Sequence, residues 1–107
     1  MKHQVLVIAE AEEDIFQIYR YVLKTDGSNR ANHLLVKLQE TCQSLSEMPS
    51  RGHIPPELER VGVSAYREIH FKPYRIIYQI VDRKIFIHCV LDGRRSLQDV
   101  LERRLFR

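Results

Sequence analysis

The sequence predicts an α+β domain spanning residues 1–107, with elements in the order β-α-α-β-β-β-α. A helix hairpin should pack on one face of a small, mainly antiparallel sheet. Apolar residues recur at helical spacing in the first half, and three strand-like runs with two-residue links fill most of the second. A chain of 107 residues has room for one hydrophobic core and not for two. Together these observations predict one α+β domain.

The first half of the chain is predicted to form a short strand and two helices. Residues 3–8 are rich in β-branched and leucine side chains, as is typical of a strand. From Ala9 the apolar residues lie three and four apart, which predicts two amphipathic helices. A polar break at residues 25–28 separates them, and Ser28 or Asn29 is the predicted cap of the second helix. The link is short, so the two helices should be antiparallel.

Three strand-like runs dominate the second half. They cover residues 66–71, 74–81 and 84–91, and their two-residue links predict an antiparallel meander. The prolines and glycines of residues 48–64 exclude long regular structure before them. Ser96-Leu97-Gln98-Asp99 resembles a capping box, which predicts a last helix through about Leu105.

The links also assign the strand side chains to two faces, because side chains alternate along strands. If residues 71 and 74 pair, and 81 and 84 pair, one face is almost wholly apolar and should pack on the helix hairpin. Its members are Ile69, Phe71, Tyr74, Ile76, Tyr78, Ile80, Ile85, Ile87, Cys89 and Leu91. The other face is mixed, so we expect it to be a working surface or to be covered by the C-terminal segment or another chain. Its members are Tyr66, Glu68, His70, Arg75, Ile77, Gln79, Phe86, His88 and Val90.

Composition narrows the function classes. No apolar run is long enough to span a bilayer, and the start lacks the features of a secretory signal, so we expect a cytoplasmic protein without a membrane partner. Cys42 and Cys89 should be buried core residues. Nucleotide, metal and nucleophile motifs are absent, so no cofactor and no metal site are expected. His3, His33 and His53 belong to no constellation and are interpreted as surface residues.

The mixed sheet face holds the residues that could cleave RNA. The predicted register places Glu68 and His88 in one cross-strand row and sets His70 opposite Arg75. A carboxylate or imidazole could take the 2′-hydroxyl proton, Arg75 could stabilise the phosphorane-like charge, and a histidine could protonate the leaving oxygen. The alternative is an ordinary set of cross-strand ion and hydrogen-bond pairs.

Charge is unevenly distributed along the chain. Residues 1–59 contain 6 Lys or Arg and 9 Asp or Glu, a net charge of −3, whereas residues 60–107 contain 11 and 5, a net charge of +6. The basic half predicts an acidic partner, either nucleic acid or a protein segment. The candidate partner-binding residues are Arg94, Arg95, Arg103, Arg104 and Arg107. The alternative is a solvated helix end, where cations suit the helix dipole.

Four stretches in this order and spacing resemble one protein family. They are the first helix with Ala11, Glu13-Asp14-Ile15 and Tyr21-Val22; Met48-Pro49-Ser50-Arg51-Gly52; Tyr66-Arg67-Glu68-Ile69 with Lys72-Pro73-Tyr74-Arg75-Ile76-Ile77-Tyr78; and Val90-Leu91-Asp92-Gly93-Arg94-Arg95 with Leu101 to Leu105. The chain is similar to the RelE/ParE superfamily of type II toxins, and within it to the ParE-like branch.

The resemblance implies a toxin with the β-α-α-β-β-β core and a C-terminal helix. It also implies a cognate acidic antitoxin that wraps the toxin in a hetero-oligomer and folds on binding. ParE-like members poison DNA gyrase and are inhibitors rather than enzymes, so no catalytic residue is expected. RelE-like members instead cut mRNA on the ribosome without a metal, and for that alternative the candidates are Glu68, His70, Arg75 and His88. A non-toxic binding module of the same fold is the third possibility.

Overall fold

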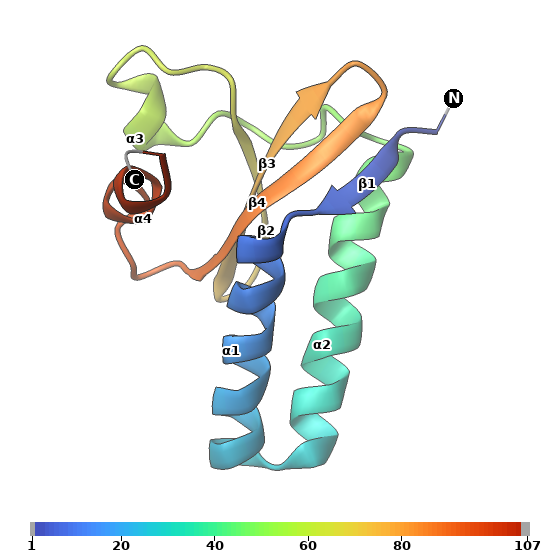
Figure 1. Cartoon of the computed structure of the whole chain (residues 1–107). Coiled ribbons are helices and arrows are strands. Elements are labelled where there is room, and N and C mark those ends of the chain that lie inside the picture. Colours follow the sequence, from blue (N-terminus) through green and yellow to red (C-terminus); the bar gives the residue numbers. More distant parts are fainter. Residues whose placement is uncertain (1, 106–107) are drawn as a thin grey trace.

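The computed structural model describes residues 2–105 and shows a four-stranded sheet with helices on both faces (Figure 1). The strands are β1 (Gln4–Val7), β2 (Arg67–Phe71), β3 (Tyr74–Val81) and β4 (Lys84–Asp92), in the spatial order β1-β4-β3-β2. Strands β2, β3 and β4 form the predicted antiparallel meander, and β1 pairs with β4 in parallel. The predicted α+β class and mainly antiparallel sheet are confirmed.

The helices cover the two sheet faces in separate groups. Helices α1 (Ala9–Asp26) and α2 (Ser28–Gln43) run side by side as the predicted hairpin, and their far end extends beyond the sheet (Figure 1). A 3₁₀ turn, η1 (Ser44–Ser46), follows them. The short α3 (Pro56–Glu59) and the C-terminal α4 (Leu97–Leu105) lie together on the opposite side of the sheet.

The link between α1 and α2 is a single glycine. Gly27 has a φ of 93°, a conformation that residues with a Cβ rarely adopt, and it terminates α1 through a hydrogen bond from its N–H to the carbonyl of Leu23. Helix α2 begins directly at Ser28 with Gly27 as its N-cap and no side-chain cap. The predicted capping by Ser28 or Asn29 is therefore wrong, because a positive-φ glycine turns the chain within one residue.

The β3–β4 pairing contains a bulge that the predicted register lacked. Pairing of Tyr78 with Ile87 is followed by pairing of Ile77 with Cys89, so His88 is the extra residue on β4. The predicted row that joined Glu68, Ile77 and His88 is therefore wrong, since Cys89 occupies the position opposite Ile77.

The bulge reverses the side-chain alternation in the last part of β4. Val90 packs with the helix hairpin, while Cys89 and Leu91 pack on the other face, the opposite of the predicted assignment. Both cysteines are buried, as predicted, and both are free thiols. The buried residues of the hairpin side are Ala11, Leu38, Cys42, Leu45, Ile69, Ile76, Tyr78, Ile85, Ile87 and Val90.

A second apolar cluster explains the mixed character of the other sheet face. Helix α4 lies over this face, which agrees with the expected alternative that the C-terminal segment covers it. Ser96 caps α4 by accepting a hydrogen bond at Oγ from the N–H of Asp99 (3.3 Å). The buried members of this cluster are Leu58, Ile77, Cys89, Leu91, Leu97, Val100 and Leu101. The polar part of the face that α4 leaves uncovered carries the candidate site.

Across residues 2–105, no helix combines the length and the apolar character that crossing a bilayer requires.

Candidate functional site

Glu68 is the centre of the polar group on the sheet face. Its side chain is only 1% exposed, and it lies on β2 one row from the His70–Arg75 pair, which face each other across β2 and β3 as predicted. Arg75 holds this carboxylate with two hydrogen bonds, from Nε to Oε1 (2.8 Å) and from Nη2 to Oε2 (2.9 Å). This forked contact fixes the orientation of the carboxylate.

Arg75 binds a second carboxylate from the other side. Helix α3 begins at Pro56, which suits a first helical position, and brings Glu57 within 2.6 Å of Arg75 Nη1 and 2.9 Å of Nη2. The hydrogen bonds that Arg75 donates to Glu57 and Glu68 raise the pKa of Arg75 above its ordinary value. The Arg75 hydrogen bond lowers the pKa of Glu57. Burial would raise the pKa of Glu68, but the hydrogen bonds from Arg75 and His70 outweigh it, so this pKa also lies below its ordinary range.

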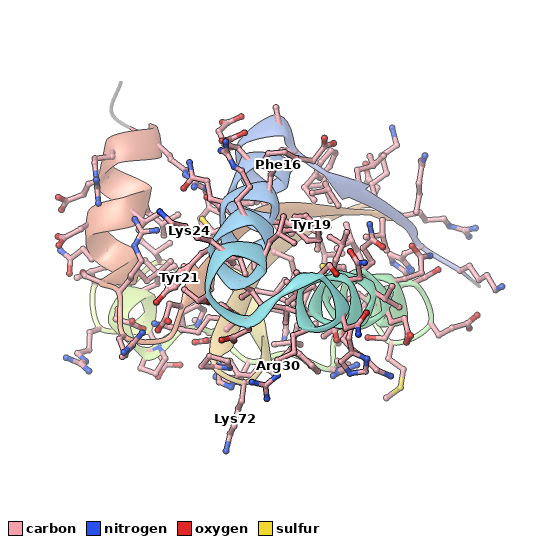
Figure 2. All side chains as sticks on the ribbon, turned by 90° about the horizontal axis from the view of Figure 1, so that it is seen from below. Phe16, Tyr19, Tyr21, Lys24, Arg30 and Lys72 are labelled. Atoms are coloured by element: carbon pink, nitrogen blue, oxygen red, sulfur yellow. The ribbon has the colours of Figure 1, made fainter. Side chains whose placement is uncertain are left out.

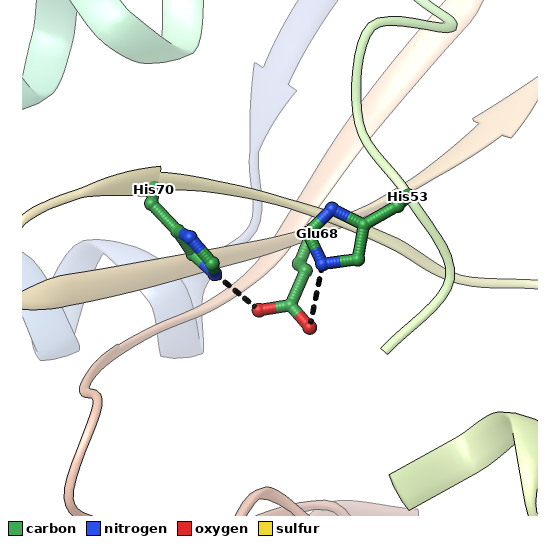
Figure 3. Close-up of side chains that lie close together, drawn as sticks. All are labelled: His53, Glu68 and His70. Carbon is green, nitrogen blue, oxygen red and sulfur yellow. Dashed lines mark hydrogen bonds and ion pairs between the residues drawn. The ribbon is translucent and has the colours of Figure 1, made fainter. Parts of the chain in front are cut away.

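Two histidines complete the group around Glu68 (Figure 3). His70 Nε2 lies 2.7 Å from Glu68 Oε1, and His53 Nε2 lies 3.5 Å from Oε2. The imidazole rings meet edge to face with centroids 5.5 Å apart. The backbones of His53 and Glu68 also exchange two hydrogen bonds, of 3.1 and 2.7 Å, so this loop residue pairs with β2 as an added strand would.

Sequence reasoning missed two members of this group. The sequence pattern indicates a surface position for His53 with no neighbouring functional residues, and it assigns no role to Glu57. Both lie in the proline- and glycine-rich segment, which has no periodicity from which a position could be inferred. For Glu68 and His70 the sequence does contain a local signal, the alternation Glu68-Ile69-His70, because residues two apart on a strand share a face.

His88, the fourth predicted candidate, lies apart from this group. As the bulged residue of β4, it makes a contact of 3.1 Å from Nε2 to Oε1 of Gln79, and its ring packs edge to face on Tyr66 with centroids 5.4 Å apart. Burial lowers its pKa below the ordinary value. The structure therefore brings together Glu68, His70 and Arg75 but not His88.

The arrangement constrains the chemistry that the group can perform. All three nitrogens of the Arg75 guanidinium donate to Glu57 or Glu68, and the Arg75 side chain is 13% exposed. A phosphate would have to displace a carboxylate to reach it. The hydrogen bonds from Arg75 and His70 outweigh burial and lower the pKa of Glu68, which weakens this carboxylate as a proton acceptor. The group thus has the character of an internal ion-pair network with two half-exposed imidazoles at its edge.

The predicted partner-binding arginines fall into two groups. Arg94, Arg95 and Arg103 are exposed, and Arg94 Nη2 pairs with Asp92 Oδ2 at 3.0 Å. Arg104 instead points inward and bonds to Asp14 and to the carbonyl oxygen of His88. Among the described members of this set, Arg94, Arg95 and Arg103 are therefore the ones accessible from solvent. Arg107 lies outside the described residues.

Two of the exposed arginines border a groove between α1 and the end of β4. This groove has a volume of about 490 Å³, and Arg94 and Arg95 line it together with Tyr21, which is 62% exposed. Its other lining residues are Asp14, Gln17, Ile18, Val22, Thr25, Asp26, Pro73, Tyr74, Val90, Leu91 and Asp92. The combination of apolar side chains with flanking charges is typical of a surface that binds a protein segment.

Helix α1 presents aromatic side chains outside this groove as well. Phe16 is 52% exposed, with the Arg20 guanidinium 4.7 Å from its ring centroid. The view along the hairpin shows Tyr21 on the side of α1 nearer to α4, and Tyr19 directed toward α2 (Figure 2). Tyr19 Oη donates to Asn32 Oδ1 at 2.8 Å, so this tyrosine links the two helices.

Comparisons with known proteins agree with the fold. Residues 5–97 match the family model described as the ParE toxin of the type II toxin–antitoxin system parDE. A chain from the chromosomal ParDE system of P. aeruginosa superposes with a TM-score of 0.71 at 16% identity, over 85% of this chain and 96% of that one. A chain from the RelBE2 toxin–antitoxin complex of Mycobacterium tuberculosis gives 0.63 at 19% identity, over 86% and 92%. At these identities the two structures establish the fold alone. A search of curated proteins found no match.

Proposed function

We propose that DNA gyrase is the target of this chain, which belongs to the ParE toxin family of type II toxin–antitoxin systems. We further propose that it acts as an inhibitor of gyrase in the cytoplasm. The resemblance of the Leu91–Arg95 segment and its following helix to the ParE-like branch supports gyrase as the target. The alternative target of the superfamily is mRNA on the ribosome.

The state of Arg75 is the observation that favours an inhibitor over a nuclease. An RNase would need a guanidinium free to meet the charge that develops on the phosphate. In this chain Glu57 and Glu68 occupy the Arg75 guanidinium, and His88 is held by Gln79 and Tyr66 on another part of the sheet. These contacts fit a structural role for the candidate nuclease residues.

The test compares both targets with one pair of proteins. Wild type and His70→Ala are incubated with gyrase and supercoiled DNA, and in parallel with translating ribosomes and message. We expect both proteins to trap DNA cleaved by gyrase and to leave the message intact. Message cleavage by wild type that His70→Ala abolishes would overturn the proposal in favour of the nuclease. If wild type acts on neither substrate, the proposal is also overturned, and a non-toxic binding module of the same fold is favoured.

An acidic antitoxin is the proposed partner of the basic half of the chain. Arg94 and Arg95 line the groove beside α1, and the three aspartates that also line it, Asp14, Asp26 and Asp92, are each paired with an arginine. An extended or helical acidic segment could therefore place apolar side chains in the groove and carboxylates on Arg94 and Arg95. The affinity of the antitoxin should fall with rising salt, because exposed charges are screened.

Charge reversal tests this contact. Arg94→Glu with Arg95→Glu should weaken binding of the antitoxin by about tenfold or more, since each change replaces attraction by repulsion. Lys84→Glu, at an exposed lysine at the opposite end of β4, is the control and should leave the affinity near that of wild type. Equal affinities for all three proteins would contradict the proposed contact.

A further inference from the structure

We propose that His53, Glu68 and His70 form a binding site for one divalent transition-metal ion of the zinc class. The inference goes beyond the gyrase proposal and uses none of the residues that line the α1 groove. No metal motif in the sequence predicts such a site, because its three ligands come from a loop and a strand rather than from a motif of fixed spacing.

Backbone geometry places the three ligands on one face. Glu68 and His70 are two residues apart on β2, so their side chains project to the same side of the sheet. His53 is the antiparallel partner of Glu68 through two backbone hydrogen bonds, which sets its side chain next to that of Glu68. The positions of the ligands are therefore fixed by main-chain pairing and not only by flexible side chains.

The separations of the donor atoms fit a metal ion. One nitrogen from each histidine and one carboxylate oxygen lie within 4.8 Å of one another. Bonds of 2.0–2.2 Å in a tetrahedral site place ligand atoms about 3.4 Å apart. The two distances from Glu68 oxygens to the Nε2 atoms of His70 and His53, 2.7 and 3.5 Å, bracket that value, so small side-chain rotations would admit an ion. Imidazole and carboxylate together suit Zn²⁺ and its neighbours in the first transition row.

The contacts behind Glu68 resemble those that orient metal ligands in general. Arg75 takes one lone pair on each oxygen of the Glu68 carboxylate and locks its rotation. A carboxylate has about four lone-pair sites, so each oxygen retains one directed toward the histidines. Such supporting hydrogen bonds hold a ligand in its productive orientation.

Local charge favours a cation at this position. Glu57 and Glu68 carry two negative charges and Arg75 one positive charge, so the network beneath the site has a net charge of −1. Arg60 and Lys72 line the same open depression of about 530 Å³, but both side chains are exposed, and their repulsion is screened by water and salt. His53 and His70 are half-exposed, which leaves a fourth coordination position for water.

The experiment titrates the full-length chain, made without a polyhistidine tag, with Zn²⁺ by calorimetry and with Co²⁺ by visible absorption. We expect one equivalent of each metal to bind and Co²⁺ to give the intense bands of low coordination number. His53→Ala and His70→Ala should each weaken binding by at least about tenfold. His33→Ala removes an exposed histidine of α2 and is the matched control, with unchanged affinity.

A second measurement on the unaltered chain guards against variants that fail to fold. In an NMR spectrum of the imidazole nitrogens, Zn²⁺ should shift the signals of His53 and His70 and leave those of His33 and His88 in place. The proposal is overturned if no metal binds, if binding survives both substitutions in the site, or if His33→Ala weakens it equally. Shifts confined to other histidines would also overturn it.

Discussion

Arg104 in α4 forms an ion pair with Asp14 in α1, 90 residues earlier in the chain. The contact joins Arg104 Nη2 to Asp14 Oδ1, and Arg104 Nη1 donates to the carbonyl of His88 at 2.6 Å. Asp14 Oδ2 accepts the N–H of Val90 at 3.0 Å. The pair therefore joins both helical layers to the bulge in β4. Side-chain exposures of 17% for Arg104 and 11% for Asp14 place it largely out of water.

The first prediction concerns the stability that this pair provides. Arg104→Met should lower the free energy of unfolding by about 3 kcal/mol, because it leaves Asp14 as a largely buried charge without its partner. Urea denaturation measures the loss. Glu102→Met, at an exposed position of the same helix, is the control and should change stability by no more than about 0.5 kcal/mol. Equal losses in the two variants would show that Arg104 acts only through its contribution to α4.

The second prediction concerns the pairing of Arg75 with Glu68. Arg75→Met should cost about 3 kcal/mol at pH 7, because the Glu68 carboxylate stays buried without its forked partner. Wild-type Glu68 has a lowered pKa, so its contribution to stability is present above the unfolded pKa and is lost as pH falls through the folded value. Without Arg75, burial acts against His70 alone, so we expect the pKa of Glu68 to rise and the sign of its contribution to reverse.

The deficit of Arg75→Met relative to wild type should therefore shrink as pH falls from 7 toward 5, as urea denaturation at several pH values would show. Adding Glu68→Gln removes the buried charge and should restore much of the lost stability at pH 7. A deficit that is independent of pH and unchanged in the double variant would mean that lost packing, not charge, causes it.

The third prediction is a pH dependence at His88. Burial lowers the pKa of this imidazole, with Arg104 contributing in the same direction against Glu10. The unfolded chain therefore binds a proton more readily, and the stabilising contribution of neutral His88 is present above about pH 6.5 and declines as pH falls below it. His88→Gln should remove this component from the pH profile of unfolding, whereas His33→Gln should retain it. Identical profiles for wild type and His88→Gln would contradict the inferred burial effect.

The order of elements could be predicted because local signals determine it. The helical spacing of apolar residues and the links at residues 72–73 and 82–83 are readable without tertiary information, and the structure has both links at these positions. The bulge at His88 could not be predicted in the same way. Nothing local marks it, while Arg104 binds the His88 carbonyl from a helix that comes later in the chain.

The residues of the candidate site also differ in whether local signals could predict their positions. Glu68, His70 and Arg75 were predicted as neighbours because strand alternation and a two-residue link specify their positions. His53 and Glu57 were not, because His53 lies in a loop and Glu57 on the short α3 that follows it, and the course of this segment depends on long-range contacts. Sequence periodicity carries no information about such a segment, and only the folded chain shows where its side chains lie.

The fourth prediction tests those long-range contacts at Gly52. A Cβ at this position would lie 2.6 Å from both the Glu68 carbonyl oxygen and Tyr78 Oη, closer than carbon and oxygen atoms can approach. Tyr78 Oη also accepts the Gly52 N–H at 3.0 Å and donates to the carbonyl of Pro49 at 2.7 Å, so the loop is fixed on both sides of the glycine. Gly52 is thus required by close packing rather than by its backbone angles.

Gly52→Ala should lower the free energy of unfolding by about 2 kcal/mol, within the range for overpacking a close contact. The displaced loop should also weaken the His53–Glu68 backbone pairing, which hydrogen exchange at the Glu68 amide would report as faster exchange in the folded state. Ser50→Ala is the matched control, because this exposed residue lies in the same loop. If the two variants denature at the same urea concentration and exchange at the same rate, the loop can move aside freely, and the position of His53 does not depend on Gly52.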